Sequence, residues 1–346
     1  MTANGRLKIV IGSPLEPVHV DRIAAAGGDR VEVVFEPQLL PVPRYEGDHH
    51  GTPRDLGPDD VARWRSLVAE ADVMFDFDWL DPSTVGERAP RLRWVQATSA
   101  GIGEFLVRTG LVQTDIRFTT AAGVHSAALA EFAALGLLYW TKDVPFLQRR
   151  QAERHWERYA AESLAGRRVL VVGLGEVGRE VARVCAAMRM DVWGMRRTAE
   201  GPLPPGVSRL VFREDLRDAL AQVDALVLAC PLTPETKGLI GAPELAALPA
   251  SAILVNVARG AVVDETALIE ALAENKIRGA MLDVFEREPL PVDSPLWSMP
   301  NVVVSPHSAS TVSDENHRIV DIFVDNLDRF LDGRPLRNEF VAERGY

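Results

Sequence analysis

Three ionisable residues in the second half of the chain each follow an apolar run typical of a buried β-strand. Arg259 follows AILVNVA, Glu288 comes shortly after GAMLDVF, and His307 follows NVVVSP. Ligands bind at the carboxyl ends of parallel strands, so these side chains are expected to converge. Singly, each is more often a surface ion pair or a solvated group. Together they suit reduction of a 2-oxo acid: a cation for the carboxylate, an acid for the carbonyl oxygen, and a carboxylate that keeps that acid protonated.

A glycine-rich turn precedes these residues in RVLVVGLGEVGREVARVC (168–185), where Gly173, Gly175 and Gly178 form a G-x-G-x-x-G motif. The first glycine permits the tight turn, the second lets a pyrophosphate approach the backbone, and the third lets helix and strand pack closely. Glycines required only for packing and an S-adenosylmethionine site are the alternatives. The strand-turn-helix context favours a dinucleotide, with its phosphates at the helix N-terminus.

The end of the next strand bears on which dinucleotide is bound. An NAD site places Asp or Glu about 20 residues further on, where it accepts a hydrogen bond from the ribose 2′-hydroxyl. Here MDVWGM (190–195) is followed by Arg196 and Arg197. A guanidinium cannot accept that bond, but it can bind a 2′-phosphate with two hydrogen bonds. Two solvated arginines are the alternative. We predict NADP as the preferred cofactor, with NAD as a second one.

Composition excludes other classes of function. The chain has 346 residues, which suggests two domains, and a net charge of −11. No long Lys/Arg cluster is present, so no nucleic-acid partner is expected. No apolar run reaches the roughly 18 residues of a membrane span, and the N-terminal segment lacks the apolar stretch of a signal peptide. Cys185 and Cys230 lie in apolar runs and are expected to be buried free thiols, with no metal site. We therefore expect a cytoplasmic protein.

Strand-like and helix-like segments alternate along the chain, which predicts an α/β fold with parallel sheets. One series precedes the glycine motif and a second follows it. The segment 37–60 is rich in Pro, Gly and charge and is predicted to be a long loop, whose role the sequence leaves open. Residues 313–333 are predicted to form an amphipathic helix with Asp or Ser as its N-cap and Gly333 beyond its end.

Five segments resemble, in order and spacing, the motifs of the D-isomer-specific 2-hydroxyacid dehydrogenase family, especially its glyoxylate/hydroxypyruvate reductase-like members. They are VVGLGEVGREVA (171–182), CPLTPETKGLIG (230–241), LVNVARGAVVDETAL (254–268), LDVFEREPLP (282–291) and LWSMPNVVVSPHSAS (296–310). The resemblance begins near residue 91. It implies two Rossmann/flavodoxin-like domains with parallel sheets and an interdomain cleft: a substrate domain of 1–118 plus 309–346 and a dinucleotide-binding domain of 119–308. It also implies a homodimer, with 123–160 as the dimer arm.

The resemblance assigns roles to individual residues. Arg259, Glu288 and His307 become catalytic, and Arg259 also binds substrate together with Ala100 and Gly101 of TSAGIG (98–103). The implied cofactor contacts are Gly173, Leu174, Gly175, Glu176, Val177, Gly178, Pro231, Thr236, Val257, Ala258 and Asp283, beside Arg196 and Arg197. Asp283 is expected to meet the nicotinamide carboxamide, with a buried helix-capping Asp as the alternative. His125 is expected to be structural, and His49 and His50 receive no role.

The expected activity is hydride transfer between NADPH and the carbonyl carbon of a small 2-oxo acid of the glyoxylate/hydroxypyruvate kind, giving the D-2-hydroxy acid. A dinucleotide-sensing corepressor and a phosphoglycerate dehydrogenase without its regulatory domain are alternatives. Formate dehydrogenase of the same superfamily carries Gln where this chain has Glu288, which argues against it. The sequence does not select among glyoxylate, hydroxypyruvate and bulkier acids. That choice is expected to depend on the region near Phe75 to Trp79.

Overall fold

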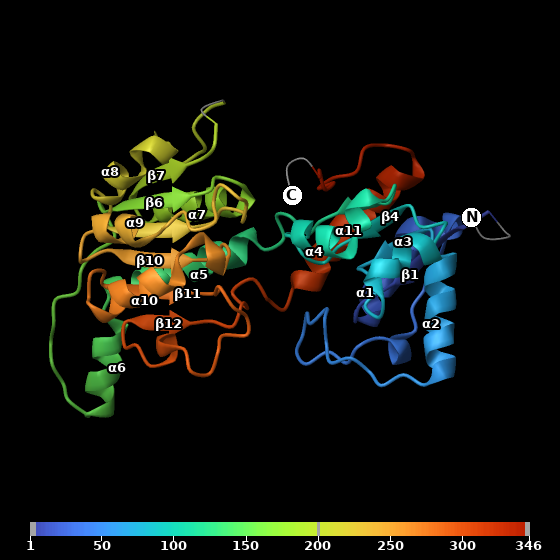
Figure 1. Ribbon diagram of the computed structural model, residues 1–346, viewed down its shortest axis with the longest axis horizontal. Helices are drawn as coiled ribbons and strands as arrows, with labels where there is room; N and C mark the ends of the chain where they lie inside the picture. Colours follow the sequence, from blue (N-terminus) through green and yellow to red (C-terminus); the bar gives the residue numbers. More distant parts are fainter. Residues whose placement is uncertain (1–4, 199–200, 343–346) are drawn as a thin grey trace. The chain divides into compact units, whose positions relative to one another are not determined.

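The computed structural model describes residues 5–198 and 201–342 and consists of two compact units (Figure 1). The first unit ends at His125 and resumes at Thr311, and the second spans Ser126–Ser310. The chain therefore crosses between the units twice. The first four residues, which open the segment inspected for a signal peptide, lie outside the described part.

The first unit is built on a five-stranded parallel sheet of order β2-β1-β3-β4-β5. Its strands are β1 (Leu7–Ile11), β2 (Val31–Val34), β3 (Val73–Phe75), β4 (Trp94–Gln96) and β5 (Arg117–Thr119). Helices α1 (Pro17–Gly27) and α11 (Glu315–Leu331) pack on one face, and α2 (Pro58–Glu70), α3 (Val85–Arg88) and α4 (Gly103–Thr109) pack on the other. Both faces are covered, which is why the strands are apolar at successive positions.

Alternate residues of each strand pack into the two hydrophobic cores that lie on opposite faces of the sheet. Ile9 and Ile11 pack with α1 and α11, whereas Val10 between them packs with α2 and α4. Trp94 stacks on Phe323 of α11 with ring centroids 4.9 Å apart. The C-terminal helix is thus an integral part of the core formed by the N-terminal strands.

The second unit contains a seven-stranded parallel sheet of order β12-β11-β10-β9-β6-β7-β8. Its strands are β6 (Arg168–Val172), β7 (Asp191–Met195), β8 (Val207–Val211), β9 (Ala225–Leu228), β10 (Ile253–Asn256), β11 (Gly279–Leu282) and β12 (Val302–Val304). Helices α5 (Ser126–Thr141) and α7 (Glu176–Ala187) cover one face, and α8 (Leu216–Leu220), α9 (Ala242–Ala247) and α10 (Glu265–Ala273) cover the other. Helix α6 (Val144–Ala152) follows α5. The two parallel α/β sheets predicted from the sequence are confirmed.

The C-terminal helix begins two residues later than the predicted segment and ends at Leu331. Asp314 occupies the predicted N-cap position, but its side chain does not cap the helix, because its carboxylate accepts hydrogen bonds from Arg318 at 2.7 and 2.9 Å. Gly333 lies beyond the end with φ = 67°, as its predicted position requires.

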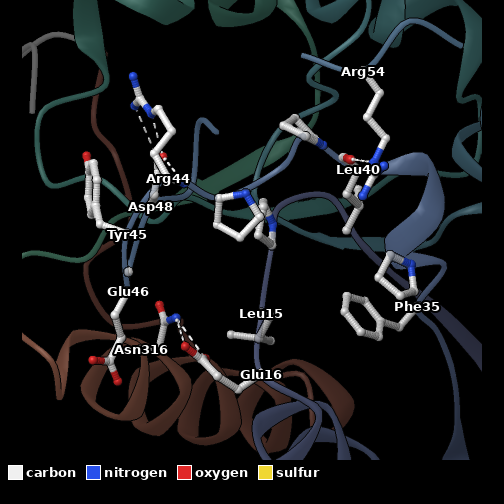
Figure 2. Close-up of a pocket in the computed structure, with 15 residues that line it drawn as sticks. Leu15, Glu16, Phe35, Leu40, Arg44, Tyr45, Glu46, Asp48, Arg54 and Asn316 are labelled. Atoms are coloured by element: carbon white, nitrogen blue, oxygen red, sulfur yellow. Dashed lines mark hydrogen bonds and ion pairs between the residues drawn. The ribbon is translucent and has the colours of Figure 1, made fainter. Parts of the chain in front are cut away.

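The segment predicted as a long loop folds back onto the first unit and ends where α2 begins at Pro58. A bridge between Val42 and Thr52 closes it. It borders a hollow of about 440 Å³ that is lined by prolines and apolar side chains together with charged groups such as Arg44, Glu46 and Arg54 (Figure 2). Within it, buried Asp48 pairs with Arg44 at 2.7 Å. The loop is therefore anchored by its own ion pair.

The same loop places His49 beside the buried carboxylate of Glu315, the first residue of α11. Glu315 is 6% exposed, and its Oε1 lies 3.8 Å from His49 Nε2 and 3.9 Å from His125 Nδ1. Burial raises the pKa of Glu315 to about 7. Burial also lowers the pKa of His49. Three segments distant in sequence thus meet at one titrating group.

The raised pKa of Glu315 predicts a pH-dependent stability. The folded chain holds this proton more tightly than the unfolded chain, so the contribution is present in acid and lost as pH rises from about 4.5 through about 7. Between about pH 5 and about pH 8, the unfolding free energy of the native protein should therefore fall by about 1–2 kcal/mol more than that of the Glu315→Gln variant. Urea denaturation followed by circular dichroism measures this difference. Glu46→Gln, at an exposed position of the loop, is the control, and a pH-independent difference for Glu315→Gln would contradict the assignment.

Candidate active site

The glycine-rich turn lies between β6 and α7, beside the point where the strand order of the second sheet reverses. Gly173 has φ = 94°, and a Cβ there would lie 2.6 Å from the Cα of Cys230. A Cβ on Gly178 would lie 1.7 Å from the carbonyl oxygen of Gly173. A Cβ on Gly175 would meet nothing within 4 Å. Packing therefore requires glycine at positions 173 and 178. Gly175 instead leaves an open backbone at the N-terminus of α7, which fits a pyrophosphate.

The other residues predicted to contact the cofactor follow neighbouring strand ends of the same sheet. Leu174 and Val177 belong to the turn and to α7, Pro231 follows β9, and Val257 and Ala258 follow β10. The hydroxyl of Thr236 donates to the carbonyl oxygen of Pro231 at 2.7 Å, which closes the turn after β9. Glu176 is the first residue of α7. These residues share one edge of the sheet, and their contacts with a cofactor stay a prediction.

Two arginines follow β7, the neighbour of β6. Arg196 is half-buried, and its Nη2 donates to the carbonyl oxygen of Gly201 at 2.9 Å. Arg197 is exposed, and its charge is among the causes that lower the pKa of Glu235, after the hydrogen bond from Thr233. No carboxylate follows the strand directly, so the usual acceptor for a ribose 2′-hydroxyl is missing from this position.

His307 and Glu288 form a hydrogen-bonded pair at the ends of β12 and β11. His307 Nδ1 lies 2.7 Å from Glu288 Oε2, and Glu288 Oε1 accepts from the backbone N–H of Phe285 at 3.0 Å. Burial acts to raise the pKa of Glu288, but hydrogen bonds from His307 and Phe285 outweigh it, and the net pKa is lowered. Glu288 is thus a carboxylate oriented at both oxygens, and it suits a partner that carries a positive charge.

Arg259 follows β10, which lies next to β11. A Cβ on the following residue, Gly260, would lie 1.8 Å from the carbonyl carbon of Phe285, so this turn packs against the backbone that leads to Glu288. The charge of Arg259 contributes to the lowered pKa of Glu288. Its Nη1 donates to the carbonyl oxygen of Ala258 at 2.7 Å. The second unit therefore brings the predicted cation, carboxylate and imidazole to one edge.

Asp283 is buried and serves as the anchor of the segment that carries His307. Its Oδ1 accepts from Ser305 Oγ at 2.5 Å and from the backbone N–H groups of Ser308 and Ala309, both at 2.9 Å. Its carbonyl oxygen accepts from the N–H of His307, which has φ = 54°. The helix-capping alternative is wrong, because Asp283 follows β11 and caps a turn and not a helix.

Ala100 and Gly101 lie in the first unit, between β4 and α4, and both are exposed. Their backbone N–H groups donate to no acceptor within the described ranges 5–198 and 201–342. The preceding Ser99 is fixed, since its carbonyl oxygen accepts from Ala121 at 3.1 Å. Two adjacent, available N–H groups on a fixed turn suit a carboxylate ligand, and that role stays a prediction.

Sequence reasoning missed the cluster of Glu315 with His49 and His125, and it included Asp76 only within the region near Phe75 to Trp79, without singling it out. No local pattern marks these residues, because their meaning depends on partners far along the chain. Among the described residues, no group of three or more His, Cys, Asp or Glu side chains is arranged to hold a metal ion. In the same part of the chain, no helix combines the length and apolar character needed to cross a membrane.

Comparison with known proteins identifies the family. The profile described as "D-isomer specific 2-hydroxyacid dehydrogenase, NAD binding domain" matches residues 135–309. Glyoxylate/hydroxypyruvate reductase B of Citrobacter koseri is 33% identical over 291 residues, which cover 82% of this chain and 89% of that protein. The chain belongs to the D-isomer specific 2-hydroxyacid dehydrogenase family. The family predicted from the sequence motifs is confirmed.

Two further relatives place the chain within this family. D-3-phosphoglycerate dehydrogenase of Archaeoglobus fulgidus is 31% identical over 281 residues, but the match spans only about half of that protein, 52%. A D-isomer specific 2-hydroxyacid dehydrogenase of Xanthobacter autotrophicus, solved in complex with NADPH and MES, is 33% identical with a TM-score of 0.78 over 99% of this chain and 100% of that one. The chain is accordingly an NAD(P)-dependent oxidoreductase of the 2-oxo acid and 2-hydroxy acid class.

The glycine geometry predicts two different defects. Gly178→Ala places a methyl group against the carbonyl of Gly173, so α7 must shift, and the melting temperature should fall by about 4 °C or more. Gly175→Ala has room and should melt like the native protein, yet its methyl group faces the expected pyrophosphate and should weaken NADPH binding about tenfold or more. Thermal melts and NADPH fluorescence titration separate the two effects. Native-like melting of Gly178→Ala would contradict the packing argument.

Proposed function

We propose that this protein reduces small 2-oxo acids of the glyoxylate/hydroxypyruvate kind with NADPH and forms the D-2-hydroxy acid. The observation that carries the proposal is the 2.7 Å pair of His307 and Glu288 beside Arg259. It lies at the edge of a sheet whose glycine turn fits a dinucleotide. The relative from Citrobacter koseri, named a glyoxylate/hydroxypyruvate reductase, and the NADPH complex from Xanthobacter autotrophicus support this choice.

Each side chain has a defined task in the proposed mechanism. Bound NADPH would supply the hydride for the carbonyl carbon of the substrate. In the second unit Arg259 is the cation for the substrate carboxylate, and in the first unit the backbone N–H groups of Ala100 and Gly101 are the available carboxylate donors. Because Nδ1 of His307 faces Glu288, its Nε2 remains to donate the proton to the carbonyl oxygen. Glu288 stabilises the imidazolium before that transfer, and neutral His307 acts as the base in the reverse reaction.

His307→Asn tests the assignment of the acid. The variant should bind NADPH with native affinity but reduce glyoxylate and hydroxypyruvate about 10²–10⁴-fold more slowly, because it cannot donate the proton. Loss of the nicotinamide absorbance measures the rate, and fluorescence titration measures binding. A variant with near-native turnover would remove His307 from the mechanism.

Glu288→Gln is the matched variant of the partner. Without the carboxylate the imidazolium is less favoured, so the pH profile of kcat/KM for reduction should move toward acid. A general loss of structure would lower the rate at every pH and leave the profile in place. An unchanged profile with native turnover would show that the pair has no part in proton transfer.

Arg196 and Arg197 support the preference for NADPH in the proposal. Charge-assisted hydrogen bonds contribute about 1.5–3 kcal/mol each, and solvent exposure reduces this, so kcat/KM should favour NADPH about ten- to a thousandfold. Arg196→Asp places a negative charge at the expected 2′-phosphate and restores an acceptor for a 2′-hydroxyl. It should weaken NADPH strongly and improve NADH. Equal use of both cofactors by the native protein would refute the proposed role of the arginines.

A homodimer and a cytoplasmic location complete the proposal. Several large apolar side chains are exposed in the predicted dimer arm: Leu135, Leu138, Leu147, Trp156 and Tyr159. Trp156 is 95% exposed, which is unusual for so large an apolar side chain and supports burial by a second copy. Cys185 and Cys230 are buried free thiols, which is typical of proteins of reducing compartments.

A further inference from the structure

Asp76 lies at the carboxyl edge of the first unit's sheet, directly after β3. Its backbone N–H donates to the carbonyl oxygen of Gln96, at the end of β4, at 2.7 Å. A Cβ on Gly12, after β1, would lie 3.1 Å from the carbonyl oxygen of Asp76. Asp76 itself has φ = 67°, a left-handed conformation that non-glycine residues rarely adopt. The ends of two neighbouring strands therefore hold Asp76 in one left-handed position, which fixes the direction of its side chain.

The side chain of Asp76 is directed to the loop that is proposed to bind the substrate carboxylate. Thr98 Oγ1 donates to Asp76 Oδ2 at 3.0 Å. Thr98 begins the segment TSAGIG, whose Ala100 and Gly101 supply the proposed N–H donors. The carboxylate of Asp76 is therefore one hydrogen bond from the start of that loop.

The charge of Asp76 is uncompensated, unlike those of its neighbours in the chain. Asp72 pairs with Arg91 at 2.8 Å, and Asp78 pairs with Arg88 at 2.9 Å. Within the described part of the chain, Asp76 forms no ion pair with Lys or Arg, although its side chain is half-buried. A half-buried carboxylate without a cation is costly and suggests a role other than stability.

The charge of Asp76 acts on a buried neighbour, His49. Burial lowers the pKa of His49, and the charge of Asp76 is the largest that opposes this, followed by Glu16 and Asp48. His49 is 7% exposed at its side chain, so the field of Asp76 reaches a site with little water to screen it.

We propose that Asp76 selects substrates by charge, so that the protein accepts 2-oxo acids whose remaining part is uncharged and rejects those with a second anionic group. This inference rests on the proposed function. The carboxylate next to the carbonyl is bound by the N–H groups of Ala100 and Gly101 in the first unit, whereas a second carboxylate or phosphate near the same loop would meet the charge of Asp76 without a cation of that unit to offset it. Glyoxylate and hydroxypyruvate fit this class. The phosphorylated substrate implied by the name of the Archaeoglobus fulgidus relative does not.

An isosteric pair of substrates tests the role of charge alone. Oxaloacetate carries a second carboxylate, and 2-oxosuccinamate replaces it by a neutral amide of the same shape. The native protein with NADPH should favour the amide by about tenfold or more in kcat/KM. Where neither compound is turned over, the ratio of their inhibition constants against glyoxylate reduction gives the same comparison.

Asp76→Asn removes the charge and little else. Asn tolerates the left-handed backbone, and its amide oxygen can accept the hydrogen bond from Thr98. The ratio of kcat/KM for the amide to kcat/KM for the acid should fall at least about fivefold in this variant. Because a tenfold change corresponds to about 1.4 kcal/mol, a shift of this size is readily measured. Raising the salt from about 0.05 to about 0.5 M should lower the ratio in the native protein and not in the variant. Asp60→Asn, an exposed position in the first turn of α2, changes the net charge equally and should keep the native ratio.

The outcomes distinguish this inference from the function on which it rests. If glyoxylate and hydroxypyruvate are not reduced with NADPH, the proposed function fails. If they are reduced but the native protein treats acid and amide alike, or Asp76→Asn keeps the native ratio while its thermal melt is native-like, charge selection by Asp76 is wrong. A ratio that falls equally in Asp60→Asn would assign the effect to net charge and also overturn the proposal.

Discussion

The contact of Gly260 with the backbone of Phe285 holds together the edge of the second unit that carries Arg259, Glu288 and His307. No residue with a Cβ fits there, since that atom would lie 1.8 Å from the carbonyl carbon of Phe285. The contact fixes the turn that carries Arg259 against the segment whose N–H orients Glu288, and Glu288 in turn orients His307. Side chains from three adjacent strands thus depend on one point of backbone packing. Because protein interiors are close-packed, a shift at this point would displace all three.

The two units carry charges of opposite sign near the residues that we propose to bind ligands. The protein has a net charge of −11, which repels anionic ligands at long range. The second unit counters this locally with Arg196, Arg197 and Arg259, and with the open helix N-terminus at Gly175. The first unit offers N–H groups at Ala100 and Gly101 and, one hydrogen bond from the start of their loop, an uncompensated carboxylate. Short-range attraction for one anionic group combined with repulsion of another is a common basis of specificity.

Much of the fold and of the candidate site was predictable because local patterns determine them. Apolar runs marked the strands, and parallel strands must end at one edge, so the convergence of Arg259 and His307 followed from their positions. The glycine turn was equally readable, although the sequence could not separate the glycines that packing requires from Gly175. Contacts between distant segments were not readable: nothing near Glu315 indicates that His49 approaches it. The contacts of Asp283 could likewise not be predicted, because its partners Ser305 and Ala309 come from another strand end.

The placement of α11 has a consequence for biosynthesis. Its side chains Ile319, Phe323 and Leu327 complete the core over Ile9, Phe75 and Trp94, yet they are translated after the entire second unit. A growing chain adds about 5–20 residues per second, so the N-terminal sheet waits for many seconds with one apolar face covered by α1 but not by α11. During that interval the second unit, continuous in sequence, has all its strands and can fold first. Residues 1–125, although they are made first, are therefore the part of the nascent chain that we expect to be most exposed to aggregation.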